Sequence, residues 1–177
     1  MLVAINIPED ACKETKELAN ELILIIPYTF ISNEKTDIRI SIREYNHLKP
    51  YILRIEDSTG EVEFKIVQYL SKSKLRNRSI ITDDVPQLIV NNFTSQLGSD
   101  VVSWLEKLFP LKIEGRQVAT FQCQNDFIFF RMYRYIFKEE KVNLQDIGPH
   151  LCLRLMKIKK NEEEIVIKKY DKKVQTL

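Results

Sequence analysis

A chain of 177 residues with 44% hydrophobic and 29% charged residues can bury a sizeable core, which excludes a disordered or fibrous protein. Its formal net charge of +2 is weak evidence for a nucleic-acid partner, because nucleic-acid-binding domains are often far more basic. No run reaches the ~20 apolar residues of a membrane span, and the amino terminus lacks a secretory signal pattern. We therefore expect a soluble protein with no membrane contact.

The first 70 residues have the pattern of a β-α-β-β-β unit. Residues 2–7 form an apolar run typical of a buried strand. The apolar positions after Pro8 have helical spacing until Pro27, which predicts a helix. Three predicted strands follow, at residues 37–43, 51–56 and 61–69. The turn at residues 57–60 is expected to make the last two strands a hairpin.

The same order of elements recurs in the second half. Residues 88–92 predict a short strand, and apolar positions between Leu97 and Leu108 predict a helix that ends before Pro110. Three more strands are predicted at residues 117–122, 127–138 and 150–157. Two successive units indicate one α/β domain of two pseudo-repeated halves. Its parts are an amino-terminal half (1–70), a basic linker (71–85), a carboxyl-terminal half (86–160) and a charged tail (161–177).

Positive charge is concentrated between residues 65 and 82. This stretch contains no acidic residue and five cations, Lys65, Lys72, Lys74, Arg76 and Arg78. Such a cluster creates a local positive potential that the net charge hides. We predict that a flexible basic linker contacts RNA phosphates, with a solvated linker that binds nothing as the alternative.

The sequence contains no recognisable catalytic or metal-binding motif. Neither of its two histidines, His47 and His150, is spaced with cysteines as in a zinc site. Its four glycines match no phosphate-binding loop, and no nucleophile-elbow motif occurs. We predict a protein without enzymatic activity, metal or cofactor. Three cysteines without close pairing favour a reducing compartment.

Residues 127–138 interleave aromatic side chains with Arg131 and Arg134. This composition suits stacking on RNA bases and contact with phosphates. On an unbroken strand the two arginines lie on opposite, largely apolar faces, so a central strand buried on both faces is the alternative.

Residues 144–160 join a Gly148-Pro149 turn to a strand of alternating character. Its leucines share one face, which can pack in the core, and its cationic or small residues share the other, which can meet phosphate. The first set is Leu151, Leu153 and Leu155, and the second is His150, Cys152 and Arg154. The candidate RNA-binding residues of the whole chain are Lys72, Lys74, Arg76, Arg78, Arg116, Arg131, Arg134, His150, Arg154 and Lys157.

The second half resembles the Brix-domain family of eukaryotic ribosome-assembly proteins. The resemblance is carried by PQLIVNNFTSQLG (86–98), LFP (108–110), GRQVATF (115–121), DFIFFRMYRYIFK (126–138) and LQDIGPHLCLRL (144–155). The first half is a looser match, chiefly through KPYILRIEDSTGEVEFKI (49–66). The resemblance implies an α/β fold of two halves, each similar to the anticodon-binding domain of class IIa aminoacyl-tRNA synthetases.

The resemblance also implies a function. It is that of a non-enzymatic nucleolar factor that binds precursor rRNA during rRNA processing and assembly of the large (60S) ribosomal subunit. Pre-60S assembly factors, including one dedicated protein partner, are the implied partners. Two alternatives stay open: a small-subunit processome factor of the same family, and a protein-interaction module whose aromatic strand docks a partner. The sequence segments NNFTSQLG and FIFFRMYRYIF favour the large-subunit branch of the family.

The chain departs from the family pattern at two places that affect these expectations. Family members usually have arginine after the Gly-Pro turn, whereas this chain has His150, whose charge titrates near neutrality. Relatives also have a helical segment between the first helix and the next strand. Here only residues 28–36 are available for it.

Overall fold

The computed structural model describes residues 1–32, 34, 36–76, 80–82, 84–109, 115–138, 141–160 and 163–167. The elements of the first half are β1 (Val3–Asn6), α1 (Lys13–Ile25), β2 (Thr29–Ile31), β3 (Ile38–Tyr45), β4 (Lys49–Asp57) and β5 (Gly60–Leu70). A short 3-10 turn, η1 (Lys72–Lys74), follows β5. The elements after it are β6 (Gln87–Asn91), α2 (Gln96–Leu108), β7 (Gln117–Gln124), β8 (Phe127–Lys138), β9 (Lys141–Asp146), β10 (His150–Lys160) and β11 (Glu163–Val166).

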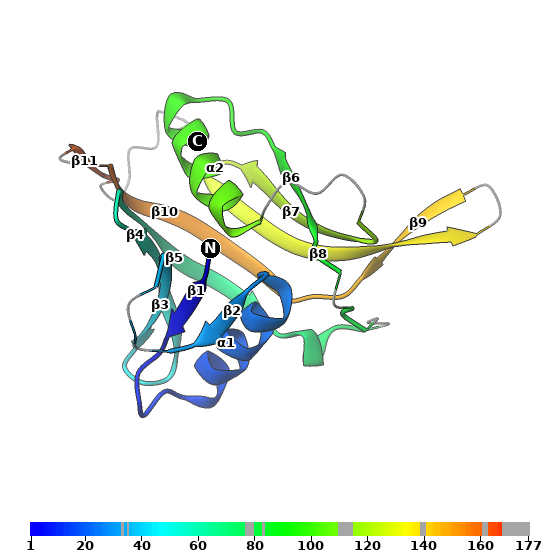
Figure 1. Ribbon diagram of the computed structural model, residues 1–177, viewed down its shortest axis with the longest axis horizontal. Helices are drawn as coiled ribbons and strands as arrows, with labels where there is room; N and C mark the ends of the chain where they lie inside the picture. Colours follow the sequence, from blue (N-terminus) through cyan, green and yellow to red (C-terminus); the bar gives the residue numbers. More distant parts are fainter. Residues whose placement is uncertain are drawn as a thin grey trace.

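All the strands belong to one sheet, whose order is β2-β1-β3-β4-β5-β10-β8-β7-β6 (Figure 1). Strand β9 pairs with β8, and β11 pairs with β10. In the first half β1 pairs in parallel with both β2 and β3, and in the second half β6 pairs in parallel with β7. The other pairings are antiparallel. The chain is therefore a mixed α/β protein built on a large sheet with few helices.

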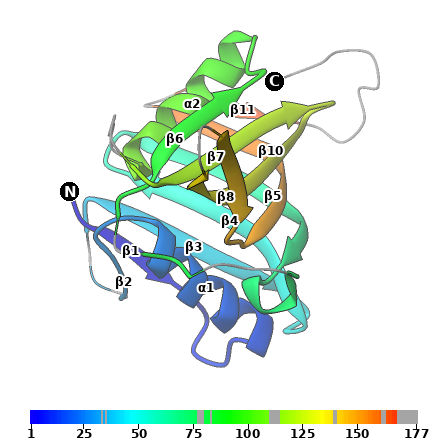
Figure 2. The same cartoon turned by 90° about the vertical axis from the view of Figure 1, so that its right-hand side faces the viewer.

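Strands β5 and β10 join the two halves. They pair antiparallel from Leu70 opposite His150 to Gly60 opposite Lys160, with one extra residue in β5 and one in β10. Gly60 is required at the far end, because a Cβ atom there would lie 2.0 Å from the carbonyl oxygen of Lys159. Figure 2 shows the resulting sheet from the side, with α1 beside the first-half strands and α2 beside the second-half strands.

Both helices cover the same face of the sheet. Leu22 of α1 and Leu105 of α2 line a single apolar cavity of about 30 Å³ together with Phe64, Phe130 and Leu153. Ser95 caps helix α2, because its hydroxyl accepts a hydrogen bond from the backbone N–H of Gly98 at 3.0 Å. Within the described part of the chain, neither helix is long and apolar enough to cross a membrane.

The sequence patterns predicted both helices and the longer strands, and the structure confirms them. The hairpin between β4 and β5 is also confirmed, with Asp57 paired to Gly60. Three short strands were not predicted: β2, β9 and β11. Strand β2 has three residues, too few for a periodic pattern, and it occupies part of the segment where relatives are expected to have a helix. Strand β11 begins with two glutamates, which are poor strand formers.

The burial of individual side chains shows which face of β10 and which face of β8 pack in the core. Leu151, Leu153 and Leu155 are buried, as the alternation of β10 predicted, whereas His150 and Arg154 are half-buried on the opposite face. In β8 the residues Ile128, Phe130 and Met132 are buried, but Phe127 and Phe129 on the other face are half-buried. The alternative of a β8 strand buried on both faces is therefore wrong.

We predict that Leu153→Ala destabilises the protein by about 2–5 kcal/mol, because it opens a cavity where the two halves and both helices meet. Leu153 is 2% exposed. Chemical denaturation gives the free energy of unfolding. Leu144→Ala, at an exposed leucine of β9, is the matched control and should change stability by less than about 1 kcal/mol. Equal losses in the two variants would contradict the assignment of the core face.

Candidate nucleic-acid interface

The sheet face opposite the helices, here called the outer face, has two regions of different electrostatic character. The boundary between them runs across the sheet beside Arg154, which pairs in register with Lys65 of β5 and Phe127 of β8. On one side of this row nearly every charge has a partner of opposite sign. On the other side, cations lie among aromatic rings.

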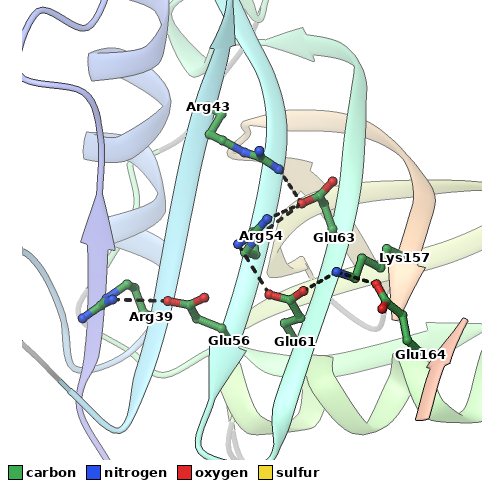
Figure 3. Close-up of polar contacts among 8 residues, drawn as sticks. All are labelled: Arg39, Arg43, Arg54, Glu56, Glu61, Glu63, Lys157 and Glu164. Carbon is green, nitrogen blue, oxygen red and sulfur yellow. Dashed lines mark hydrogen bonds and ion pairs between the residues drawn. The ribbon is translucent and has the colours of Figure 1, made fainter. Parts of the chain in front are cut away.

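The paired region comprises four cations and four carboxylates on β3, β4, β5, β10 and β11 (Figure 3): Arg39, Arg43, Arg54, Lys157, Glu56, Glu61, Glu63 and Glu164. Arg54 contacts Glu63 at 2.9 Å and Glu61 at 3.5 Å. Arg43 forms a further ion pair with Glu63. Because the charges of this region balance, it offers little net potential to attract phosphates.

Lys157, a predicted RNA-binding residue, belongs to the paired region. Its Nζ lies 2.6 Å from Glu164 and 2.7 Å from Glu61. The hydrogen bonds to Glu164 and Glu61 raise the pKa of Lys157. The hydrogen bond from Lys157 lowers the pKa of Glu61. The structure therefore gives this lysine an intramolecular role that the sequence did not indicate.

The open region comprises eight outer-face residues of β5, β8 and β10: Lys65, Phe127, Phe129, Arg131, Tyr133, His150, Cys152 and Arg154. The Arg154 guanidinium lies 5.6 Å from the ring centroid of Phe127. The Nζ of Lys65 lies 5.1 Å from the ring of Tyr51. Neither cation has a carboxylate partner among the described residues. Both charges therefore remain available to an external anion.

Arg131 and His150 interact across β8 and β10. The Arg131 guanidinium lies 2.5 Å from His150 Nδ1, and His150 Nε2 lies 2.6 Å from the Asp146 carboxylate. The other oxygen of Asp146 accepts a hydrogen bond from the backbone N–H of Gly148 at 3.0 Å. The Gly-Pro turn, the end of β9 and the side chains of Arg131 and His150 thus form one hydrogen-bonded group.

The expectation of a flexible linker is wrong for its first five residues. Ser71 is 1% exposed, and its hydroxyl lies 3.0 Å from the Glu21 carboxylate of α1. The Lys72 backbone N–H donates to Glu21 at 2.7 Å, and Lys74 forms an ion pair with Glu14 at 3.4 Å. Burial raises the pKa of Glu21. The turn η1 is therefore fixed to α1.

The same turn packs against the Gly-Pro turn before β10. Gly148 has φ +55°, and a Cβ atom there would lie 2.3 Å from a methyl carbon of Leu75 and 3.3 Å from the Cα of Lys72. Gly148 is therefore needed both for its backbone conformation and for this close approach. The contact places the linker backbone at Lys72 against the turn that precedes His150.

The predicted site residues are thus only partly assembled. Arg131, His150 and Arg154 lie in the open region, the Lys72 backbone lies against Gly148, and Lys74 is paired to α1. Arg76 and Arg116 are exposed, and Arg134 lies on the other face of β8. Arg78 lies outside the described residues. Lys65 was not among the predicted site residues, because only the pairing register, which the sequence does not reveal, places it beside Arg154.

Strands β8 and β9 continue beyond the sheet as a two-stranded arm, seen in yellow in Figure 1. Register pairs Tyr135 with Leu144 and Phe137 with Val142. Phe137 is 70% exposed, and Val142 and Leu144 are also exposed. Because alternate residues share a face, this apolar stripe is continuous with the rings of the open region.

Comparison with known proteins assigns the fold to a family. The family model described as "Brix domain" matches residues 11–157. The chain belongs to the Brix-domain family. The expected resemblance is therefore confirmed over both halves of the sheet.

Relatives of this Brix chain have names connected with ribosome production. Ribosome production factor 1 of Rattus norvegicus is 44% identical over 140 residues, covering 77% of this chain and 40% of that protein. Ribosome production factor 1 of Saccharomyces cerevisiae is 38% identical over 104 residues, covering 57% of this chain and 35% of that protein. The chain thus spans about 40% of the length of the first of these curated relatives.

Two archaeal crystal structures have the same fold. A probable ribosomal biogenesis protein from Aeropyrum pernix K1 superimposes with a TM-score of 0.63 at 12% identity, covering 94% of this chain and 99% of that one. Mil, an archaeal Imp4-like protein, superimposes with a TM-score of 0.52 at 11% identity, covering 93% and 99%. At such identities the likeness concerns the fold alone.

We predict that Lys157→Gln lowers the free energy of unfolding by about 1 kcal/mol at neutral pH, since partly exposed ion pairs contribute about this much. The lowered pKa of Glu61 means that its share of the stability is present above the ordinary value of 4.5 and is lost as the pH falls. The raised pKa of Lys157 means that its share is lost only above 10.5.

The loss should therefore shrink in acid, which denaturant unfolding at neutral pH and at a pH well below 4.5 can measure. Lys159→Gln, the next outward lysine of β10, is the control and should cost less at neutral pH. A loss from Lys157→Gln that is equal at both pH values would exclude the ion pairs as its cause.

Proposed function

We propose that this protein is a non-enzymatic ribosome biogenesis factor that binds precursor rRNA through the open region during assembly of the large subunit, in the nucleolus. The observation that carries the proposal is a pair of adjacent cations, Lys65 and Arg154, beside the ring of Phe127 on the outer face of the sheet. Neither cation has a carboxylate partner in the part of the chain that the structure describes. The names of the relatives support the ribosomal context.

The chemistry of the open region fits single-stranded RNA. Unpaired bases stack on aromatic side chains and on guanidinium planes, while nearby cations contact the backbone phosphates. The Arg154 guanidinium lies over the ring of Phe127, 5.6 Å from its centroid, and Arg131 lies on the same face between Phe129 and Tyr133. Double-stranded RNA would instead require contacts spread over a much wider surface.

We further propose that the two halves arose from one repeated β-α-β-β-β unit, each resembling the anticodon-binding domain of class IIa aminoacyl-tRNA synthetases. The common order of parallel and antiparallel pairings in the two halves supports this. In this reading, residues 1–70 and 86–160 are the halves, and residues 161–177 are a tail that begins near β11.

A second candidate function is docking of a protein partner on the arm. The exposed stripe of Phe137, Val142 and Leu144 favours it, because contiguous exposed apolar residues commonly mark interaction sites. This docking is compatible with RNA binding by the open region, and it agrees with the expectation of a pre-60S protein partner. Sequencing the rRNA that co-purifies with the tagged protein separates the readings: large-subunit precursors support the proposal, and small-subunit precursors contradict it. Protein without enriched rRNA leaves docking as the main function.

We predict that Arg154→Ala lowers affinity for single-stranded RNA by about 1–2 kcal/mol, the value of a charge-assisted contact. It should also make the slope of log K against log salt shallower by about 0.7, since one phosphate contact is lost. Fluorescence anisotropy over a salt titration measures both quantities.

Arg39→Ala is the matched control, because Arg39 is a partly exposed arginine of the same face that pairs with Glu56 in the paired region. It should leave affinity and salt slope nearly unchanged. If the two variants lose affinity equally, the RNA surface is not confined to the open region.

A further inference from the structure

His150 lies in a chain of three side chains from three strands. Arg131 of β8 contacts its Nδ1 at 2.5 Å, and Asp146 of β9 contacts its Nε2 at 2.6 Å. The imidazole is largely enclosed, with 19% of its side chain exposed. Both ring nitrogens are therefore occupied by groups of known hydrogen-bonding character.

These contacts define which nitrogen carries the proton. A guanidinium has five N–H donors and no acceptor, so Nδ1 of His150 must present its lone pair to Arg131. A neutral imidazole with a bare Nδ1 carries its proton on Nε2, which can then donate to the Asp146 carboxylate. The geometry thus fits one species only, the neutral Nε2–H tautomer.

Protonation of the imidazole is incompatible with the same arrangement. An imidazolium has a hydrogen on each nitrogen, so it has no lone pair to accept from Arg131 and places two cations in contact. Asp146 would keep its bond to Nε2, because a carboxylate accepts equally well from the charged ring. The contact that must break is therefore that of Arg131.

We propose that His150 is a positioning residue that holds the Arg131 guanidinium in place for an RNA phosphate only while the imidazole is neutral, so that acidification releases Arg131. This inference rests on the proposed function, since it concerns how RNA contact at the open region is regulated. Fixing a guanidinium in advance reduces the entropy lost when it binds a phosphate.

The charged and titratable groups around His150 come from each neighbouring element. Strand β8 contributes Arg131 and Tyr133, and β9 contributes Asp146, which is opposite Tyr133 in the register. Strand β5 contributes Leu70, which is uncharged. The backbone of Lys72 in η1 lies against the adjoining Gly148. Arg131 is the group that a proton on Nδ1 would face directly.

A double-mutant cycle tests the coupling between the two residues. Wild type, Arg131→Gln, His150→Ala and the double variant are titrated with a uridine-rich single-stranded RNA at a pH of about 8 and at a pH of about 5.5. At the higher pH we expect Arg131→Gln to weaken binding about 10-fold and His150→Ala about 5-fold, as for a charge-assisted contact and its support. The double variant should bind no more weakly than Arg131→Gln alone.

At the lower pH the coupling should disappear, because Arg131 is already released. His150→Asn provides the rescue, since its amide oxygen can accept from Arg131 but cannot titrate. The His150→Asn variant should retain the contribution of Arg131 to RNA affinity at both pH values. Additive effects of the two single variants, or a coupling that is unchanged at the lower pH, would overturn the inference.

Two further measurements separate the possible failures. If Arg131→Gln leaves RNA binding unchanged while Arg154→Ala weakens it, the inference is wrong and the proposed function stands. If neither substitution matters, the proposed function is wrong as well. Nitrogen-15 NMR of the wild-type protein near pH 8 tests the tautomer without any substitution. We expect the Nε2–H form, and the Nδ1–H form would overturn the inference.

Discussion

The antiparallel pairing of β5 with β10 is the interaction on which the rest of the structure depends. Strand β10 is the last long strand of the chain and β5 the last of the first half, so their pairing makes one sheet from two sets of strands. It also aligns Lys65 with Arg154, two residues 89 positions apart whose proximity only this register creates. On the buried side, the same pairing places Phe64 next to Leu155 and both helices over a shared core.

The register shifts within this pairing determine the charge pattern of the outer face. In an unbroken strand Arg154 and Lys157 would lie on opposite faces, because they are three residues apart. A register shift between Leu155 and Lys157 adds a residue, so that Leu155 and Ile158 are both buried and Lys157 turns outward. There it meets Glu61 and Glu164, which completes the paired region and leaves Arg154 at its border. A single extra residue thus places Lys157 among carboxylates, whereas Arg154 has no carboxylate partner among the described residues.

Much of the fold followed from local patterns, whereas the site depended on long-range pairing. The alternation of leucines in β10 and the proline-bounded helices were visible in the sequence, because burial on one face repeats with a fixed period. The packing of η1 against α1 could not be predicted, because it depends on hydrogen bonds from Ser71 to Glu17 and Glu21. These two glutamates lie 54 and 50 positions earlier in the chain. Lys157 was assigned to RNA because its carboxylate partners lie on other strands. The clusters of positive charge in the sequence therefore indicated where cations gather. Only the pairing register of the strands showed which of these cations are neutralised by carboxylates.

The central claim is that RNA contacts the open region of the outer face and not the paired region or the helix-covered side. Ultraviolet cross-linking of the protein to single-stranded RNA, followed by mass spectrometry of the attached peptides, tests it most directly. The account predicts cross-links on the aromatic rings of Phe127, Phe129 and Tyr133, which belong to the open region of the outer face. Cross-links confined to β3 and β4, or to α1 and α2, would contradict it.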